Sequence, residues 1–401
     1  MSAPEPITDA AGAAALAADA RAAGRAAIDF EFLWERTYRP QPCLVSVAVD
    51  GRVELLDPIE GAPLGPVGEM VADPSVTVIM HAPSADLILL VSALGIRPTA
   101  IVDTQLLAGF VGLGSGQSLG SLVERALGVR LAKTESYTDW ARRPLSQEQL
   151  TYAADDVRYL LQLADELQAR VQRLGREQWA ADEHARRYGP GARFVPDPDE
   201  AWRRVKGHGR LSPTDRAVLR SLAAWREREA ARRDRPAAWV VPDRTLLELA
   251  RRRATSRAGI QGERGLPERL RPAELDGILE AIRTGVEEAP LPLPPPPPPE
   301  VRARLEPLVA LGQVLVGARA AAAEIAPVLV ASRDDIETFL AAALEEGIDG
   351  HALAAGWRRE LVGDALLELA AGRLALGVGG RRPYLAEVPL GDDLGPRAAP
   401  V

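Results

Sequence analysis

The chain has 401 residues, of which 47% are hydrophobic and 26% charged, with a formal net charge of −8 and a single cysteine. This length exceeds one ordinary globular domain and the composition is that of a folded chain, so we expect two or three domains. No stretch approaches the roughly 18 consecutive apolar residues of a membrane span, and the first residues lack the basic start of a secretory signal. One cysteine excludes an internal disulfide and a cysteine-based zinc cluster, and we expect a reducing, cytoplasmic location.

The positive charge is concentrated in one part of the chain. Residues 201–289 carry 20 arginines and lysines against 13 acidic residues, a net of +7, so the rest of the chain carries −15. The net charge alone argues against a nucleic-acid partner. A basic module joined to acidic surroundings instead indicates that one part of the protein is suited to polyanions.

The first part of the chain alternates between strand-like and helix-like patterns. We expect a helix over 10–23 and a meander of three strands over 26–33, 43–49 and 53–56, with Asp50-Gly51 as the hairpin turn between the last two. A buried strand is expected over 76–80. The remaining expected elements are a helix over 83–94, a short strand over 100–102, a helix over 105–111, a glycine-rich loop over 112–120, and one long helix over 146–174. This pattern predicts a mixed sheet covered by helices.

The second half of the chain reads as helical. The expected divisions are a first domain over 1–188, a linker over 189–209, a helical domain over 210–289, a proline-rich linker over 290–300, a helical C-terminal domain over 301–385 and a ragged tail over 386–401. The unbroken run Pro294–Pro299 favours a polyproline II segment. We expect Trp225 and Trp239 to be core residues of the first helical domain. The fold class is therefore α/β followed by all-α.

Four acidic residues occupy positions where solvated carboxylates are uncommon. Asp29 and Glu31 lie in an apolar strand and share one of its faces, because side chains alternate along a strand. Asp86 follows the buried strand, and Asp156 lies one helical turn after Tyr152. Four hard oxygen ligands suit two Mg²⁺ or Mn²⁺ ions, which together can cleave a phosphodiester. The tyrosine hydroxyl is suited to orienting the attacking water.

Each of these residues also has a plain structural explanation. In this explanation, the Asp-x-Glu triplet is a solvated pair of the common kind. Asp86 is then a charge at a helix start favoured by the helix dipole, and Asp156 is one of several surface charges. The order of the motifs favours the site: a strand-borne Asp-x-Glu, an acid after a second strand, then Tyr-x3-Asp in a later helix.

These motifs carry a family resemblance. The segments IDFEF, HAPSADL, VDTQLL and TDWARRPLSQEQLTYAADDVRYL resemble ribonuclease D of the DEDD exonuclease superfamily, in its tyrosine-containing branch, over about residues 10–180. The stretch LRSLAAWREREAARRDRPAAWVVPDRTLLELA resembles an HRDC domain, and the third helical part resembles a second such domain more weakly. The resemblance implies an RNase H-like exonuclease domain with one or two helical HRDC-type domains.

The resemblance also implies roles for individual residues. Asp29 and Glu31 match the first exonuclease motif, Asp86 the second, and Tyr152 with Asp156 the third; the four acids would hold two divalent metals for 3′-to-5′ hydrolysis of RNA. Phe30 replaces the small residue usual between the first two acids, and as it points away from them we expect repacking rather than loss of metal. His81 is a candidate nucleotide contact, although a histidine that ends a buried strand is more often simply hydrogen-bonded.

The arginines of the helical domain are the candidate nucleic-acid surface. Arg251, Arg252, Arg253 and Arg257 are clustered, with Arg264, Arg269 and Arg271 close behind, and such a patch gives salt-dependent affinity for a strand. The alternative is that these arginines pair with Glu248, Glu263, Glu268 and Glu274 on a solvated surface.

The resulting hypothesis is a metal-dependent 3′-to-5′ exoribonuclease that trims structured RNA precursors, tRNA being the usual substrate class of the family, with release of 5′-mononucleotides. Two alternatives stay open at this point. One is a DNA exonuclease, because the same carboxylates cut DNA, and the other is a catalytically silent RNA-binding or scaffold protein. We expect no membrane partner.

Overall fold

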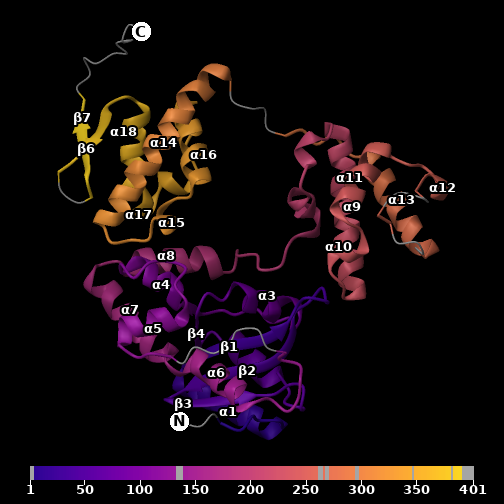
Figure 1. Cartoon of the computed structure of the whole chain (residues 1–401), viewed down its shortest axis with the longest axis vertical. Helices are drawn as coiled ribbons and strands as arrows, with labels where there is room; N and C mark the ends of the chain where they lie inside the picture. The colour runs from indigo at the N-terminus through magenta and orange to yellow at the C-terminus, as the bar shows by residue number, and fades with distance from the viewer. Residues whose placement is uncertain are drawn as a thin grey trace. The chain divides into compact units, whose positions relative to one another are not determined.

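The computed structural model describes residues 4–131, 139–260, 265–266, 271–293, 298–345, 347–380 and 383–390. The chain forms two compact units, each built from segments that are distant in sequence (Figure 1). The first unit comprises residues 1–101, 133–158 and 188–295, and the second comprises residues 102–132, 159–187 and 296–401.

A five-stranded mixed sheet forms the framework of the N-terminal part of the chain, in the order β3-β2-β1-β4-β5. Its strands are β1 (Arg25–Leu33), β2 (Gln41–Val49), β3 (Arg52–Leu56), β4 (Thr77–Met80) and β5 (Ile101–Asp103). The central strand β1 pairs antiparallel with β2 and parallel with β4. All five expected strands are present, and the mixed sheet is confirmed.

One face of the sheet is covered by an apolar cluster. Ile28 and Phe30 of β1 and Val45 and Val47 of β2 are buried in one apolar cluster on the first face. The helices of this part of the first unit are α1 (Ala10–Ala23), α2 (Gly65–Ala72), α3 (Ser84–Ser92) and α6 (Gln147–Arg158). Helix α1 contributes small alanines to that cluster and begins at Asp9, whose carboxylate accepts a hydrogen bond from the Gly12 N–H.

The helical module of the first unit packs around its own core. Its elements are η1 (Pro198–Arg204), η2 (His208–Arg210), α9 (Pro213–Arg233), α10 (Ala237–Val240), α11 (Asp243–Arg252), α12 (Arg257–Ile260) and α13 (Pro272–Glu287). Trp202 and Val205, expected in a linker, are buried in this core, so the module begins near Pro198 rather than at residue 210. The expectation for Trp239 was wrong, because its side chain is 59% exposed, whereas Trp225 packs against the core.

The loop that follows β1 contacts this helical module. The backbone N–H groups of Tyr38 and Arg39 donate to one carboxylate oxygen of Asp234, at 3.1 and 3.0 Å. The Tyr38 hydroxyl donates to Glu227 at 2.9 Å, and the Arg39 guanidinium donates to the Ala231 carbonyl at 2.8 Å. The end of β1 is thus joined by side-chain and backbone hydrogen bonds to helix α9.

The second unit contains further helices from the first half of the chain. These are α4 (Thr104–Phe110), α5 (Leu119–Leu127), α7 (Leu160–Arg173) and α8 (Glu177–Tyr188). The expected single helix over 146–174 is in fact two helices, α6 and α7, separated at Tyr159. The glycine-rich loop ends earlier than expected, because the Ser118 hydroxyl accepts from the Ser121 N–H and begins α5.

The C-terminal part of the second unit is not entirely helical. Its helices are α14 (Pro299–Ala322), α15 (Pro327–Val330), α16 (Arg333–Leu344), η3 (Ala352–Ala354), α17 (Gly356–Arg358), η4 (Arg359–Gly363) and α18 (Asp364–Ala370). They are followed by an antiparallel pair, β6 (Leu374–Val378) and β7 (Leu385–Pro389), which corrects the helical and tail expectations there. Of the proline run, residues 294–297 lie outside the described residues, and Pro299 begins α14 rather than extending a polyproline II segment.

Helix α14 is long and apolar enough to cross a membrane by length and composition alone, with a mean hydropathy of 1.3 in its best window. This is weak support for a span, because a core helix passes the same test. One side of α14 is buried through residues such as Leu305, Val309 and Leu315, and Gly312 lies close to Ile336 of α16 and Leu366 of α18.

Candidate active site

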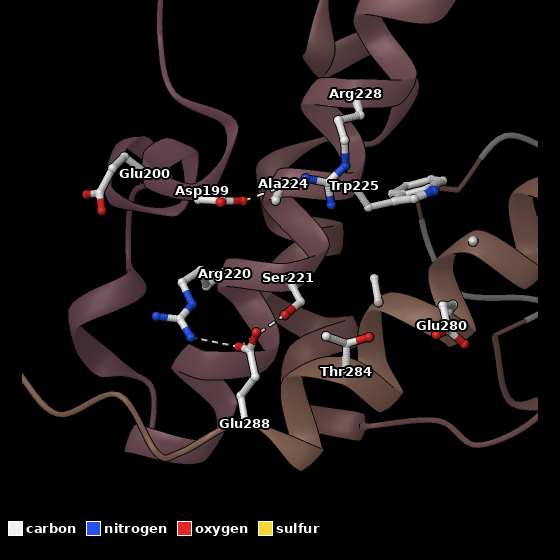
Figure 2. A pocket seen from close by; sticks show the side chains of 12 residues that line it. Asp199, Glu200, Arg220, Ser221, Ala224, Trp225, Arg228, Glu280, Thr284 and Glu288 are labelled. Carbon is white, nitrogen blue, oxygen red and sulfur yellow. Dashed lines mark hydrogen bonds and ion pairs between the residues drawn. The ribbon is translucent and has the colours of Figure 1, made fainter.

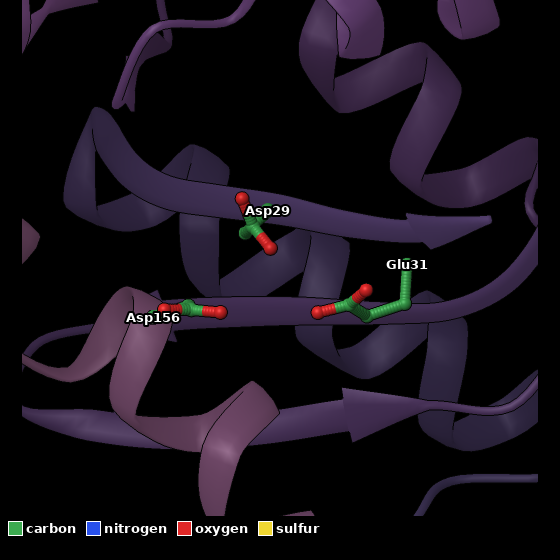
Figure 3. Close-up of side chains that lie close together, drawn as sticks. All are labelled: Asp29, Glu31 and Asp156. Carbon is green, nitrogen blue, oxygen red and sulfur yellow. The ribbon is translucent and has the colours of Figure 1, made fainter. Parts of the chain in front are cut away.

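Two elements of the first unit bring three carboxylates together. Asp29 and Glu31 project from the same face of β1, while Phe30 points into the apolar cluster on the other face, as expected. Asp156 comes from α6, which packs on this part of the sheet. One carboxylate oxygen from each acid lies within 4.8 Å of the other two. Figure 3 shows the three side chains turned toward a common space.

The fourth acid, Asp86, lies beside this group in the first turn of α3. Its side chain is 9% exposed and accepts backbone hydrogen bonds from Asp86 itself and from Phe30. Asp86 is not part of the close group of three carboxylates, although its charge acts on both Asp29 and Glu31. The backbone hydrogen bond with Phe30 connects the second acidic motif directly to the strand that carries the first.

The electrostatics of the group are those of crowded, buried acids. Burial, together with the charges of Asp86, Asp156 and Glu31, raises the pKa of Asp29 well above its usual value. Burial, then the charges of Asp156 and Asp86, raises the pKa of Glu31 to about 8. Burial also raises the pKa of Asp156 to about 7 and that of Asp86 to about 6. Desolvation is the largest cause of each shift, and neighbouring negative charges add to it at Asp29, Glu31 and Asp156.

The donor set fits a divalent cation. The close group consists of carboxylate oxygens, and such hard donors suit Mg²⁺ or Mn²⁺ rather than a softer metal. A cation bound among these acids would relieve the repulsion that raises their pKa values. The tertiary structure therefore brings the acids of the first and third sequence motifs into one cluster, with Asp86 of the second motif beside it, and this cluster has the charge and chemistry of a metal site.

Tyr152 is held against the same group. Its hydroxyl hydrogen-bonds the Asp156 carboxylate, and burial, with the charges of Asp156, Glu31 and Asp29, raises the pKa of Tyr152. Its ring lies 6.0 Å from that of buried Trp140, which precedes α6. The phenol therefore keeps its proton at neutral pH and serves as a hydrogen-bond donor.

A buried ion pair braces the segment that leads into α6. The Arg143 guanidinium donates to both oxygens of Asp57, at 2.6 Å each, and to the carbonyls of Cys43 and Trp140. The Asp57 side chain is only 3% exposed. The role of Asp57 could not be predicted from the sequence, since the pairing spans 86 positions. Cys43, whose carbonyl accepts from Arg143, is itself buried.

Asp103 and Gln105 belong to the segment VDTQLL, and both make structural hydrogen bonds. Asp103 caps helix α4 by accepting a hydrogen bond from the Gln105 N–H at 2.9 Å, and the Gln105 amide donates to the Gln117 carbonyl. His81 directly follows β4 and is partly exposed. A substrate contact from His81 stays a prediction.

Several of the described arginines of the helical module take part in ion pairs. Arg251 pairs with Glu248 at 2.6 Å, Arg253 with Asp215 at 3.0 Å, and Arg257 with Asp276 at 2.5 Å. Arg271 pairs with Glu274, while Glu263, Arg264, Glu268 and Arg269 lie outside the described residues. The side chains of Arg251, Arg253 and Arg257 are nevertheless 42–51% exposed, so these pairs are weak surface interactions that a phosphate can replace.

The module also contains a cavity of about 400 Å³ between η1, α9 and α13. Figure 2 shows Glu288 in this cavity, bonded to both Arg220 and Ser221. The acidic lining residues outnumber the basic ones; the acids are Asp199, Glu200, Glu280 and Glu288, and the bases are Arg220 and Arg228. This balance does not suit a phosphate, and the cavity includes none of the exonuclease acids.

The mixed sheet, the acid cluster and the appended helical module together define a 3′-5′ exonuclease with an HRDC domain. Residues 4–172 match the family model described as a 3′-5′ exonuclease, and residues 215–282 match that of the HRDC domain. The crystal structure of Escherichia coli RNase D superposes with a TM-score of 0.74 at 30% identity, covering 93% of this chain and 99% of that one.

Curated relatives extend the similarity over most of the sequence. Ribonuclease D of Acidiphilium cryptum is 35% identical over 366 residues, which is 90% of this chain and 92% of that protein. Ribonuclease D of Gluconacetobacter diazotrophicus is 36% identical over 371 residues, covering 88% and 90% of the two chains. The chain belongs to the ribonuclease D family. It is a 3′-5′ exoribonuclease, with the RNase H-like fold expected from its sequence.

Proposed function

We propose that this exoribonuclease trims the 3′ ends of structured RNAs, such as tRNA precursors, in the cytoplasm, using two divalent ions, Mg²⁺ or Mn²⁺. The observation that carries the catalytic part is the cluster of Asp29, Glu31 and Asp156, whose oxygens lie within 4.8 Å of one another. The substrate class rests on similarity, because the superposed Escherichia coli RNase D is described as an exoribonuclease involved in structured RNA processing.

The side chains have distinct roles in this proposal. Asp29, Glu31, Asp86 and Asp156 would hold the ions, which when bound activate a water and stabilise the leaving oxygen at the scissile phosphate. Tyr152 would orient the attacking water through its hydroxyl, which already donates to Asp156. His81 would contact the terminal nucleotide from the end of β4.

The helical module would hold the RNA body. Its HRDC match implies nucleic-acid binding, and Arg251, Arg252, Arg253 and Arg257 supply the candidate phosphate contacts. Sequence-independent contacts of this kind suit an enzyme that processes several RNAs with different sequences.

A substrate comparison tests this proposal. Purified protein is given a structured RNA with a single-stranded 3′ extension, the extension alone, and a DNA of the same sequence. The proposal predicts removal of the extension in single-nucleotide steps, arrest at the duplex, and slower loss of DNA. Equal or faster loss of DNA would contradict the RNA assignment, and degradation through the duplex would contradict the trimming role.

A further inference from the structure

Ser46 is an anomaly in the apolar strand β2. Its side chain is 1% exposed, and in the part of the chain that the structure describes its hydroxyl has no hydrogen-bond partner. A buried polar group without a partner is costly, and proteins rarely retain one without a use. The residues on either side, Val45 and Val47, are fully buried and apolar.

The position of Ser46 connects it to the active site. Ser46 is the direct cross-strand partner of Asp29 in the antiparallel β1–β2 pair, so both side chains stand on the same face of the sheet. Its partner on the other side is Leu55, and its same-face neighbours along β2 are Leu44 and Ala48. Asp29 is thus the only polar residue among these neighbours of the hydroxyl.

We propose that Ser46 is a positioning residue for the metal site: its hydroxyl donates a hydrogen bond to the Asp29 carboxylate when a divalent ion is bound there. A carboxylate that ligates an ion through one oxygen is commonly fixed by a hydrogen bond to the other oxygen, and loss of such a bond weakens metal affinity about 10- to 100-fold. This inference rests on the metal site of the proposed function.

The proposal makes the effect of Ser46 depend on the metal. Without an ion the hydroxyl has no acceptor, so Ser46→Ala removes an unsatisfied polar group and leaves the thermal midpoint in EDTA unchanged or higher. With an ion bound, the same substitution removes a hydrogen bond to a ligand. We expect Ser46→Ala to bind Mn²⁺ at least about 10-fold more weakly than the wild type in calorimetry.

Two further variants separate positioning from packing. Ser46→Thr keeps the hydroxyl on a β-branched side chain that suits a strand, and it should restore most of the Mn²⁺ affinity. Ser92→Ala removes the other buried, unpartnered serine hydroxyl among the described residues, which lies at the end of α3, and it should leave Mn²⁺ affinity unchanged.

The full-length proteins are titrated with MnCl₂ and melted with and without it. A wild-type affinity in Ser46→Ala would overturn the role of Ser46 while leaving the metal site intact. An equal loss of affinity in Ser92→Ala would also overturn it, since any buried hydroxyl would then suffice. A wild-type protein that binds no Mn²⁺ would overturn the metal site itself, and the inference with it.

Discussion

At the scale of single residues, the proposed metal site consists of carboxylates whose charged forms are disfavoured by burial. The pKa values of Glu31, Asp156 and Asp86 are raised because each acid is desolvated, and for Glu31 also because it faces like charges. Such a cluster destabilises the metal-free fold. Binding of a cation removes this destabilisation and is favoured by the same amount. The function of each acid can therefore be tested by removing its charge alone.

Asp156→Asn should abolish most of the activity while the fold is retained. The amide keeps the size of the side chain but loses the charge that a metal ligand needs, so we expect kcat to fall about 100-fold or more. Asp155→Asn is the matched control, because Asp155 is adjacent on α6 but pairs with Arg158 at 2.8 Å. Equal activity of the two variants, measured on a labelled RNA, would contradict the assignment of Asp156.

Tyr152→Phe tests orientation of the water. The ring and its contact with Trp140 are kept, and the substitution removes only the hydroxyl that bonds Asp156. We expect kcat to fall roughly 100-fold, with Mn²⁺ affinity and KM little changed. Steady-state kinetics with calorimetry would show this split, whereas a loss of metal binding would assign the hydroxyl to the metal site instead.

At the scale of elements, the site depends on how α6 and α3 are held against β1. Because the acids come from three separate elements, the precision of the cluster depends on packing and on braces such as the Arg143–Asp57 pair. These interactions are long-range in sequence, and they determine where α6 lies on the sheet.

Asp57→Ala should destabilise the protein strongly. It leaves the Arg143 guanidinium without its buried counter-charge, and breaking such a pair costs about 3–5 kcal/mol. Urea denaturation gives the free energy of unfolding, with Asp19→Ala as the control, because Asp19 also pairs with an arginine, Arg52, but is 47% exposed. A loss for Asp57→Ala no larger than that of the control would mean that the brace is unimportant.

The acid cluster also predicts how stability depends on pH. The folded pKa values of Glu31, Asp156 and Asp86 are about 8, 7 and 6, against ordinary values of 4.5, 3.8 and 3.8. The metal-free folded protein therefore binds more protons than the unfolded chain, and its stability should fall as pH rises from about 4 to about 8.

Denaturation in EDTA across this pH range measures the effect, and saturating Mg²⁺ should flatten the curve because the ion replaces the protons. Glu31→Gln should reduce the slope at the upper end. A stability curve in EDTA that stays level, or rises, between about pH 6 and 8 would contradict the crowded-carboxylate description.

Some features of the strands and helices could be predicted from the sequence, and others could not. Alternation along β1 was enough to place Asp29 and Glu31 on one face and Phe30 on the other, since this is a local property of a strand. The break at Tyr159 was missed because helical periodicity continues through it. Trp202 was hidden within a proline- and glycine-rich stretch, and Ser46 could be connected to Asp29 only once the register between strands was known.

At the scale of the whole molecule, positive charge is concentrated in the helical module and negative charge in the rest of the chain. Residues 201–289 carry a net charge of +7, although Arg251, Arg253 and Arg257 each have a carboxylate partner. The motifs predicted the class because they are short and ordered along the chain, whereas the roles of the individual site residues stay predictions. The β6–β7 pair and the beginning of the helical module could not be predicted, because they depend on tertiary contacts.

The arginine surface can be tested through its salt dependence. Replacing Arg251, Arg252, Arg253 and Arg257 with glutamine should weaken RNA binding uniformly across sequences. The slope of log affinity against log salt should fall by about 0.7 for each phosphate that an arginine no longer neutralises. Arg373→Gln, an exposed arginine paired with Glu368, is the control. An unchanged slope would show that RNA binds elsewhere.

The most direct test of the central claim follows a 5′-labelled single-stranded RNA in the presence of Mg²⁺ or Mn²⁺. The claim is that carboxylates from β1, α3 and α6 hold divalent ions that hydrolyse RNA from its 3′ end. It predicts a ladder that shortens from the 3′ end and disappears with EDTA and with Asp29→Ala. A ladder that persists in the Asp29→Ala protein, or one that survives EDTA, would contradict it.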